Sequence, residues 1–291
     1  MIDLHSHILP GIDDGARDLA MSLDMARAWV ADGVEVVACT PHILPGVYAN
    51  SGPQILTAVA ELQRALDEHA IPLKLVAGAD NHVVASFVAD LKRGHLLPLA
   101  GSRYVLVEPP HHIMPPRLES LFFDICVAGY VPILTHPERL TWISTNYGVM
   151  ERLVKAGTWM QITAGSLTGN FGNKPKYYAE RMLSDGLVHI LATDAHDTVK
   201  RRPILAEGRE RAARLVGADE ARLLVEYRPR LILSNALPSL SPEPRATLGT
   251  EGSNASTKTL SEQSDQARAR ASSAGTDAGG GILGRLRRFL H

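Results

Sequence analysis

One short segment organises the whole sequence: Asp3-Leu-His-Ser-His-Ile-Leu-Pro-Gly-Ile-Asp-Asp-Gly15. In an extended strand, residues i and i+2 point to the same face, so His5 and His7 can present both imidazoles to one point. The Pro and Gly residues that follow can turn the chain and return Asp13 and Asp14 to that point. Such convergence predicts a metal site at a strand end. The alternative is a polar strand end with two solvated histidines.

Strands that alternate with helices follow this segment. Short apolar runs predict strands at 2–4, 34–39, 73–79, 104–107, 131–134, 159–163 and 188–192. Helical periodicity separates them, at 19–30, 51–66, 83–93, 116–128, 147–156, 177–184, 206–216 and 218–227, with a polar, Gly-rich loop at 164–176. This alternation predicts a parallel α/β architecture, either closed into a barrel or wound as an open sheet.

Side chains that bind metals recur where these strands end. The set consists of His5 and His7, His42, Asp80, Glu108, His136, and Asp194 with His196. Among the seven predicted strands, only 159–163 offers no such ligand. The C-terminal ends of the strands share one face of an α/β barrel, and the active site is built on that face. The pattern therefore favours the barrel.

Composition limits the class of protein. The 291 residues are enough for one large domain with a tail, and a net charge of −1 gives no argument for nucleic-acid binding. Residues 1–3 lack the basic and apolar regions of a signal peptide, and no window approaches the roughly 18 apolar residues of a membrane span. Two cysteines, Cys39 and Cys126, indicate a reducing compartment without a disulfide framework. We therefore expect a soluble, cytoplasmic protein.

The composition changes after residue 238, which predicts a folded domain at 1–238. Residues 239–281 are rich in Ser, Ala, Gly, Thr and Glu without apolar periodicity, so they predict a disordered linker. Residues 282–291 can form a short helix with apolar residues on one side and arginines on the other. This pattern suggests a weak peripheral contact with a membrane or a partner. An inert tail is the alternative, because about ten residues form only a marginal helix alone.

The combined set of side chains indicates more than one metal ion. Histidine accounts for only 12 of the 291 residues, yet strand after strand ends on His, Asp or Glu. About nine N and O ligands, with no thiolate required, can hold two or three divalent ions. Such a mixed set suits Mn, Fe or Zn better than Cu or Ca.

The order of these motifs resembles the polymerase-and-histidinol-phosphatase (PHP) domain. Within it, the runs at 5–15 and at Thr135-His-Pro-Glu-Arg139 are similar to those of bacterial protein-tyrosine phosphatases of capsule and exopolysaccharide operons. The resemblance covers residues 1–238. It implies a distorted (β/α)7, TIM-like barrel that holds three metal ions, with Mn²⁺ favoured and Fe or Zn as alternatives. It also implies a partner tyrosine kinase that bears the phosphotyrosine.

The resemblance further implies a set of ligands. The first metal would take His5, His7, Asp80 and Asp194, the second would share Asp80 and add Glu108 and His136, and the third would take Asp14, His42 and His196. The family usually has Glu at position 80, so Asp80 is one methylene shorter and alters the bridge between two metals. His82, two residues on, is interpreted as a residue that supports the ligands.

Two arginines are the candidates for contacting a phosphoryl group. Arg139 follows His136 by three residues, and Arg201 follows His196 by five residues. The family pattern has arginine at both positions. A planar, permanently charged guanidinium suits bidentate phosphate binding and charge relief at the leaving oxygen. For Arg201 the alternative is a solvated basic turn within Lys200-Arg201-Arg202. The loop Gly169-Asn-Phe-Gly172 is similar to a family segment, and its role stays open.

Other functions compete with this prediction. A cysteine-based phosphatase needs an Arg six residues after its Cys, but Pro45 and Pro132 stand at those positions. Cysteine catalysis is therefore excluded. The expected activity is metal-dependent hydrolysis of phosphotyrosine. A small-molecule phosphomonoesterase, such as a histidinol phosphatase, is one alternative. A non-catalytic, metal-binding regulatory module is another, and the complete ligand set argues against it.

Overall fold

The computed structural model describes residues 1–247 of the chain. Nine strands lie in that range: β1 (Ile2–Ser6), β2 (Val36–Cys39), β3 (His42–Ile43), β4 (Lys74–Ala77), β5 (Asp80–His82), β6 (Tyr104–Glu108), β7 (Val131–Thr135), β8 (Trp159–Thr163) and β9 (Ile190–Ala192). Each predicted strand has a counterpart among them, so the alternating pattern is confirmed.

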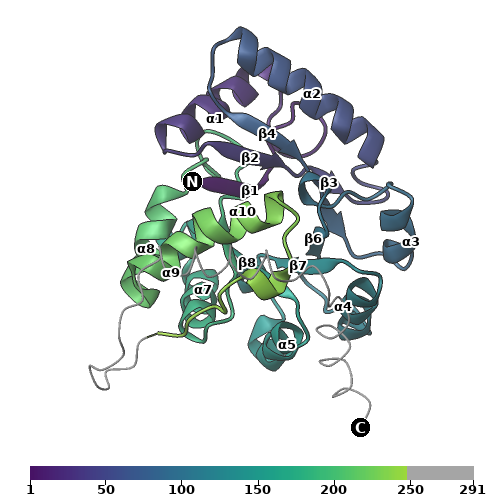
Figure 1. The fold of residues 1–291 in the computed structure, drawn as a ribbon, viewed down its shortest axis with the longest axis vertical. Coiled ribbons are helices and arrows are strands. Elements are labelled where there is room, and N and C mark those ends of the chain that lie inside the picture. Colours follow the sequence, from purple (N-terminus) through teal and green to yellow (C-terminus); the bar gives the residue numbers. More distant parts are fainter. Residues whose placement is uncertain (248–291) are drawn as a thin grey trace, which may run out of the picture. The chain divides into compact units, whose positions relative to one another are not determined.

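The strands form two parallel sheets that curl around a common interior (Figure 1). One sheet has the order β1-β2-β4, and the other has the order β3-β5-β6-β7-β8-β9. A backbone hydrogen bond joins the sheets on one side, where the amide of Asp194, past β9, donates to the His5 carbonyl at 2.9 Å. On the other side the chain itself passes from one sheet to the other, from β2 into β3 and from β4 into β5. The fold is therefore a mixed α/β fold with a curled parallel sheet, as the predicted class requires.

Two of the predicted strands are interrupted near their ends. β3 begins three residues after β2 ends, and β5 begins three residues after β4 ends. Pro41 lacks the N–H that a regular ladder needs at the first break. At the second break, a Cβ on Gly78 would lie 2.8 Å from a Leu99 side-chain atom. The two short strands that follow pair His42 with Asp80.

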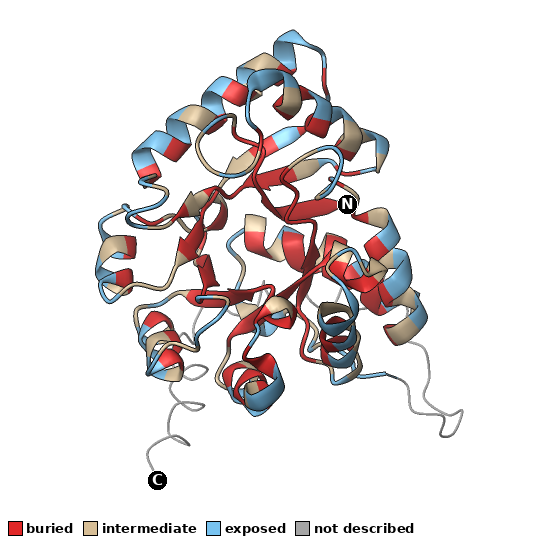
Figure 2. Ribbon diagram, turned by 180° about the vertical axis from the view of Figure 1, so that it is seen from behind, coloured by how far each residue is buried: buried red, intermediate tan, exposed pale blue. Residues whose placement is uncertain are grey.

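Helices surround the strands (Figures 1 and 2). They are α1 (Leu19–Ala31), α2 (Gly52–Glu68), α3 (Phe87–Lys92), α4 (Leu118–Val127), α5 (Ile143–Lys155), α6 (Ala164–Thr168), α7 (Asn173–Ser184), α8 (Ala206–Val216), α9 (Ala218–Arg222) and α10 (Arg228–Leu233). A π-helical stretch, η3 (Leu223–Tyr227), and 3₁₀ turns at η1 (Leu99–Gly101), η2 (Pro137–Arg139) and η4 (Pro238–Leu240) complete the described chain.

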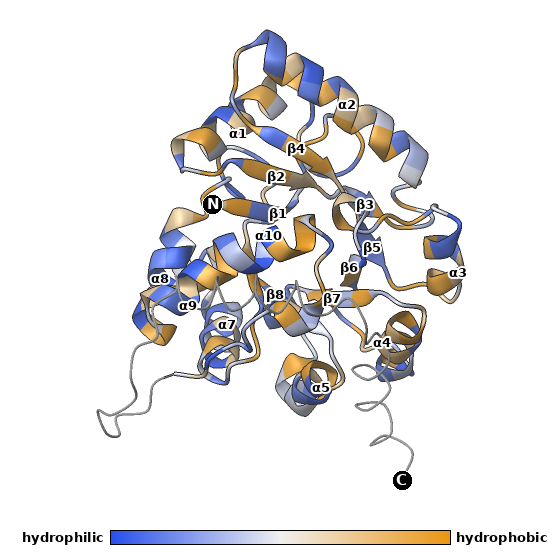
Figure 3. Ribbon diagram, in the orientation of Figure 1, coloured by the Kyte–Doolittle hydropathy of each residue, from blue (hydrophilic) through white to orange (hydrophobic). Residues whose placement is uncertain are grey.

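Local sequence explains the longer helices. Asp18 caps α1 by accepting a hydrogen bond from the Met21 amide at 2.9 Å. Along α2, the predicted stripe of Ile55, Val59, Leu62 and Leu66 is buried, and hydrophobic and hydrophilic residues alternate along this helix (Figure 3). An amphipathic helix of this kind gains most of its stability from packing its apolar stripe on the sheet.

An apolar cluster fills the space that the strands enclose. It includes Ile2, Leu4, Tyr104, Leu106, Ile133, Trp159, Ile190 and, from α10, Ile232. Along β6, Tyr104, Leu106 and Glu108 alternate onto one face. Glu108 therefore lies next to the apolar layer on the same face of β6, at the C-terminal end of the strand. The polar side chains gather on that side of the apolar layer.

The segment 164–176 differs from the prediction. It was expected to be a polar loop, but it contains α6 and the start of α7. The buried carboxylate of Glu138 accepts hydrogen bonds from the Thr163 amide at 2.9 Å and the Ser166 hydroxyl at 2.8 Å. It thereby satisfies groups at the start of α6 for which the local sequence has no side-chain cap. Two further corrections are that α5 begins at Ile143 instead of residue 147, and that α10 is absent from the prediction.

The described chain continues past the predicted boundary at residue 238. The Arg228 guanidinium donates to the Pro242 carbonyl at 3.2 Å, and the Thr247 amide donates to the Ser184 carbonyl at 3.0 Å. Most of the predicted linker 239–281, and all of the segment 282–291, lie outside the described residues. Within residues 1–247, none of the helices has the length and apolar character needed to cross a membrane.

Candidate metal centre

All nine predicted metal ligands come together at one end of the strands. His5 and His7 lie at the end of β1, His42 opens β3, Asp80 opens β5, Glu108 ends β6, His136 follows β7, Asp194 and His196 follow β9, and Asp14 lies in the loop after β1. Parallel strands that end on one face explain why residues far apart in sequence meet here.

Their ligand atoms form overlapping groups in which every atom lies within 4.8 Å of the others. The groups are His7, Asp14, His42 and His196; His5, His7 and Asp80; His5, His136 and Asp194; His42, His82 and Glu108; and Glu108, His111 and His136. The sharing of residues between groups indicates a cluster of adjacent positions for ions. Two members, His82 and His111, were outside the predicted set.

Carboxylates bridge the histidines of this cluster. Asp80 Oδ2 lies 3.4 Å from His5 Nε2 and 3.5 Å from His42 Nδ1. Asp194 Oδ1 lies 3.5 Å from His5 Nε2 and 3.2 Å from His7 Nε2. These separations leave each carboxylate between two imidazoles, as expected for oxygen atoms that share ions with their neighbours.

Several buried polar atoms of the cluster have no hydrogen-bond partner. They are both carboxylate oxygens of Asp80, Glu108 Oε2, His42 Nδ1, His136 Nδ1 and His196 Nε2. Leaving a buried polar group unpaired costs about 1–3 kcal/mol, and native proteins rarely do so. Lone pairs that converge without donors fit divalent cations, and the mixture of imidazole and carboxylate atoms fits the donor preference of Mn, Fe or Zn.

A second layer of contacts orients the histidines. His5 Nδ1 lies 2.8 Å from Gln161 Oε1, and His7 Nδ1 lies 2.7 Å from Asp13 Oδ2. Such partners fix the ring orientation of histidines that bind metals through the other nitrogen. β8, the strand predicted to offer no ligand, therefore contributes Gln161 as a supporting residue.

The charges of the cluster are strongly coupled. Burial lowers the pKa of His42, but the carboxylates of Glu108, Asp80 and Asp14 more than reverse this effect and raise it to about 10. Burial, with Arg139, lowers the pKa of His136 to about 4. Carboxylates therefore dominate part of the site, and a bound cation would displace protons from His42.

Both predicted arginines reach the cluster. The guanidinium groups of Arg139 and Arg201 each donate to Asp194 Oδ2. The guanidinium carbon of Arg139 lies 4.5 Å from the centre of the Phe171 ring, and that of Arg201 lies 5.9 Å from it. Arg201 is thus placed at the site, and the alternative of a solvated basic turn is wrong for this residue.

Two residues of the cluster adopt backbone conformations that are rare outside glycine. His136 has φ of 34° and follows directly on β7, and Asp194 has φ of 51° and lies two residues past the end of β9. Strain of this kind persists only where the surrounding structure enforces it, and it concentrates at functional sites. This backbone conformation directs the side chains of His136 and Asp194 into the cluster.

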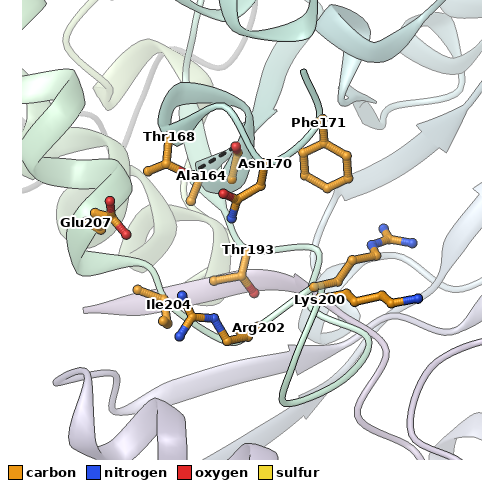
Figure 4. Close-up of a pocket in the computed structure, with 11 residues that line it drawn as sticks. Ala164, Thr168, Asn170, Phe171, Thr193, Lys200, Arg202, Ile204 and Glu207 are labelled. Carbon is orange, nitrogen blue, oxygen red and sulfur yellow. Dashed lines mark hydrogen bonds between the residues drawn. The ribbon is translucent and has the colours of Figure 1, made fainter. Parts of the chain in front are cut away.

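A pocket adjoins the cluster beyond Arg201 (Figure 4). Its lining comes from α6, from the loop that follows it, from the segment after β9 and from the start of α8: Ala164, Gly165, Thr168, Asn170, Phe171, Thr193, Lys200, Arg201, Arg202, Ile204 and Glu207. Phe171 and Lys200 lie on one side of it, and Arg202 and Ile204 lie on the other. The loop Gly169–Gly172 therefore borders the site, because its residues Asn170 and Phe171 line this pocket.

Comparison with known proteins extends these observations. Residues 1–234 match the family described as capsular polysaccharide synthesis, CpsB/CapC. The tyrosine-protein phosphatase YwqE of Bacillus subtilis (strain 168) is 35% identical over 244 residues, which cover 84% of this chain and 96% of that protein. The tyrosine-protein phosphatase CpsB of Streptococcus pneumoniae is 26% identical over 242 residues, which cover 81% of this chain and 100% of that protein.

Solved structures show the same fold. Crystal structures of YwqE and CpsB, which are called unique metal-dependent tyrosine phosphatases, include a chain that is 35% identical and superposes with a TM-score of 0.80. The superposition covers 86% of this chain and 100% of that chain. The family match spans every strand and every residue of the cluster. The chain therefore belongs to the CpsB/CapC family of capsular polysaccharide synthesis.

Proposed function

We propose that this chain is a metal-dependent tyrosine-protein phosphatase that acts on phosphotyrosine in a partner tyrosine kinase of capsular or exopolysaccharide synthesis. The observation that carries the proposal is the cluster of buried ligand atoms without hydrogen-bond partners, next to two arginines that converge on Asp194. The relatives YwqE and CpsB bear the name of this activity.

We assign three divalent ions to the nine ligands, with Mn²⁺ favoured and Fe or Zn as alternatives. Of the overlapping groups, that of Asp14, His42 and His196 supports the third position. When bound, such ions activate a water molecule near neutral pH and neutralise phosphoryl oxygens. The side chain of Asp14 is 45% exposed, whereas those of His5 and Asp80 are fully buried, so a substrate would approach from the Asp14 side.

The two arginines would then meet the phosphoryl group. Each guanidinium already directs one donor at Asp194, which leaves further donors for phosphoryl oxygens. Phe171 holds an aromatic face against Arg139. Fixed cations of this kind stabilise the charge that develops during phosphoryl transfer without reorganising.

We also propose that the curled sheets are a distorted (β/α)7 barrel of the PHP type. In this assignment β2 with β3, and β4 with β5, each count as one interrupted strand. The parallel bridge between Ser6 and Ala195 supports closure between β1 and β9. Free Cys39 and Cys126 support a cytoplasmic location.

Turnover of a phosphotyrosine peptide by the purified protein tests the function. We expect hydrolysis that a chelator abolishes and Mn²⁺ restores, and that is faster than hydrolysis of phosphoserine peptide or histidinol phosphate. Faster turnover of histidinol phosphate would favour the small-molecule phosphomonoesterase. Absence of turnover on every ester by metal-loaded protein would favour the regulatory module.

A further inference from the structure

His82 lies on the same face of β5 as a predicted ligand. Asp80 and His82 are two residues apart on an extended strand, so their side chains point the same way. Asn81, between them, points elsewhere, and its side-chain Nδ2 donates to the carbonyls of Ala79, Leu97 and Leu106 at 2.9, 3.0 and 3.1 Å. These three hydrogen bonds anchor the side chain of Asn81 and so fix which way the alternating side chains of β5 point. His82 consequently faces the cluster.

Strand register places His82 against a second predicted ligand. His82 and Glu108 are Cα partners in the parallel pair of β5 and β6, which lie side by side in Figure 3. The same strand pairs on its other side with β3, where Asp80 is the partner of His42. The spacing of Asp80 and His82 also repeats that of Asp194 and His196.

The contacts of His82 have the character of converging ligands. His82 Nε2 touches Glu108 Oε2, and His42 Nδ1 lies 3.2 Å from the same oxygen. Both His42 Nδ1 and Glu108 Oε2 are buried, yet neither has a hydrogen-bond partner in the described chain. The nitrogens therefore stand close to the oxygen without the geometry of a donated proton. The side chain of His82 is only 15% exposed, so water cannot replace the missing partners freely.

We propose that His82 is a direct metal ligand, and that it holds one of the three divalent ions together with Glu108 and His42 Nδ1. Their ligand atoms lie within 4.8 Å of one another, which is close enough for one ion to contact all three. His42 then serves this ion, and His7, Asp14 and His196 remain for the third position. The inference rests on the metal centre of the proposed function and extends its ligand set, but it does not depend on which ester is hydrolysed. A supporting role, in which His82 only orients Glu108, is the alternative.

Metal binding by His82→Gln, compared with wild type and with His112→Gln, tests the proposal. His112 is an exposed neighbour of the site that belongs to none of the described ligand groups, so it is a matched control. Each protein is stripped with a chelator and titrated with Mn²⁺ against a competing indicator. The number of ions retained is then counted by elemental analysis. The visible spectrum of the Co²⁺-loaded proteins is recorded in parallel.

We expect His82→Gln to lose one equivalent of Mn²⁺, or to bind it more than about 100-fold more weakly, which exceeds the usual loss when a supporting residue is removed. The Co²⁺ bands should shift in His82→Gln and stay unchanged in His112→Gln. A full equivalent count with superimposable Co²⁺ spectra would overturn the proposal. A weaker ion with unchanged Co²⁺ bands would also overturn it, because it would assign His82 a supporting role.

A second substitution guards against a variant that fails to fold. His82→Asp replaces the nitrogen by an oxygen that can still bind a cation, so it should keep the metal count and shift the Co²⁺ bands. Unchanged bands in this variant would contradict the proposal. Neither readout uses a substrate. If the wild-type protein binds metal but hydrolyses no phosphotyrosine, the proposed function fails while these metal measurements still decide the role of His82.

Discussion

At the scale of single residues, Asp194 divides its two oxygens between two tasks. Oδ1 faces His5 and His7, and Oδ2 accepts hydrogen bonds from Arg139 and Arg201. Burial raises the pKa of Asp194, but Arg201, His5 and Arg139 outweigh it and hold the pKa well below its ordinary value. The ionised carboxylate of Asp194 thus links the ligand cluster to the guanidinium groups of Arg139 and Arg201, which would contact the phosphoryl group.

Replacing either arginine should slow hydrolysis without emptying the site. We expect Arg139→Ala and Arg201→Ala to lower kcat/KM by about 10² to 10³, because each removes one fixed cation near the developing charge. Arg→Lys should recover only part of the rate, since Lys is a point charge without a planar fork. Steady-state kinetics on a phosphotyrosine peptide and on nitrophenyl phosphate, with metal analysis, measures the effect.

Arg211→Ala is the control for these substitutions, because Arg211 is exposed on α8 and does not line the pocket beside the site. It should change the rate by less than about threefold, as surface substitutions usually have small effects. If Arg139 relieves charge on the tyrosyl oxygen, its loss should matter more for phosphotyrosine than for the activated ester. Wild-type rates in both alanine variants would refute the role given to the arginines.

His189 should make the fold sensitive to acid. Its ring stacks on Trp159, and its Nδ1 accepts a hydrogen bond from the Met160 amide, so it is held neutral. Burial, with the nearby charge of Arg228, lowers its pKa to about 3. The unfolded chain binds the proton more readily, so this contribution to stability is complete above pH about 6.5 and is lost as the pH falls toward 3.

Between pH 7 and pH 5 this effect should cost about 2 kcal/mol of unfolding free energy. His189→Gln should lower stability at pH 7 but lose less on acidification than wild type does. Denaturant unfolding of the chelator-treated proteins measures the difference, with exposed His69→Gln as the control. An equal pH slope in wild type and His189→Gln would contradict the lowered pKa, because it would mean that His189 binds a proton as readily in the native fold as in the unfolded chain.

Residue types and spacing predicted most of the site, but they did not predict its supporting contacts. His, Asp and Glu at the ends of successive strands identified eight of the nine predicted ligands, because strand polarity brings those ends together. Asp14 was added by the turn after the first strand and by the family resemblance. His111, which lies 3.2 Å from Glu108 Oε1, belongs to a loop whose path no local pattern specifies. Gln161 was not predicted as a supporting residue, because a glutamine within a strand carries no sequence signal for contact with a ligand. His82 carried a signal, namely its spacing from Asp80.

At the scale of secondary-structure elements, Glu138 organises the start of α6. Its carboxylate accepts from the Thr163 amide and the Ser166 hydroxyl, and all three residues are buried. Burial raises the pKa of Glu138. α6 in turn carries residues that line the pocket beside the cluster. A residue from η2 thus fixes a helix that borders the site.

Removing this carboxylate should destabilise the protein. Glu138→Ala leaves two buried donors without a partner, which we expect to cost about 2–4 kcal/mol. Glu138→Gln keeps an acceptor oxygen in place and should cost less than half as much, so it is the matched control. Thermal or denaturant unfolding of the metal-free proteins measures both. Equal losses in the two variants would mean that volume, and not hydrogen bonding, is what Glu138 supplies.

Elements with strong local signals were predicted well, whereas those that depend on distant partners were not. The apolar stripe of α2 and the Asp18 cap of α1 are determined by residues that are close together in the sequence. In contrast, α6 depends on Glu138, 25 residues earlier than Thr163. The interruption after β4 likewise involves packing of Gly78 against Leu99, which no strand pattern reveals, whereas Pro41 in the sequence marks the interruption after β2.

At the scale of the whole molecule, the folded unit extends to Thr247. Arg228 is fully buried, pairs with Glu220 at 2.7 Å and donates to the Pro242 carbonyl. A chain truncated after residue 247 should therefore keep wild-type stability and full turnover of a small aryl phosphate. Truncation after residue 241 should lower the unfolding free energy by about 1–3 kcal/mol, because a charged donor loses its acceptor.

Unfolding curves and aryl-phosphate turnover of the two truncated proteins check this prediction. Neither truncation removes a residue of the ligand cluster, so turnover at 25 °C should be similar in both. If the protein ending at residue 247 folded but lost most of its turnover, residues beyond 247 would have to take part in the reaction.

The most direct test of the metal centre is to titrate Mn²⁺ into metal-free protein while following both the bound equivalents and the hydrolysis of a phosphotyrosine peptide. We expect no activity in the stripped protein and full activity only after more than one equivalent has bound, because nine converging ligands exceed the capacity of one ion. Full activity with one equivalent or none would contradict it.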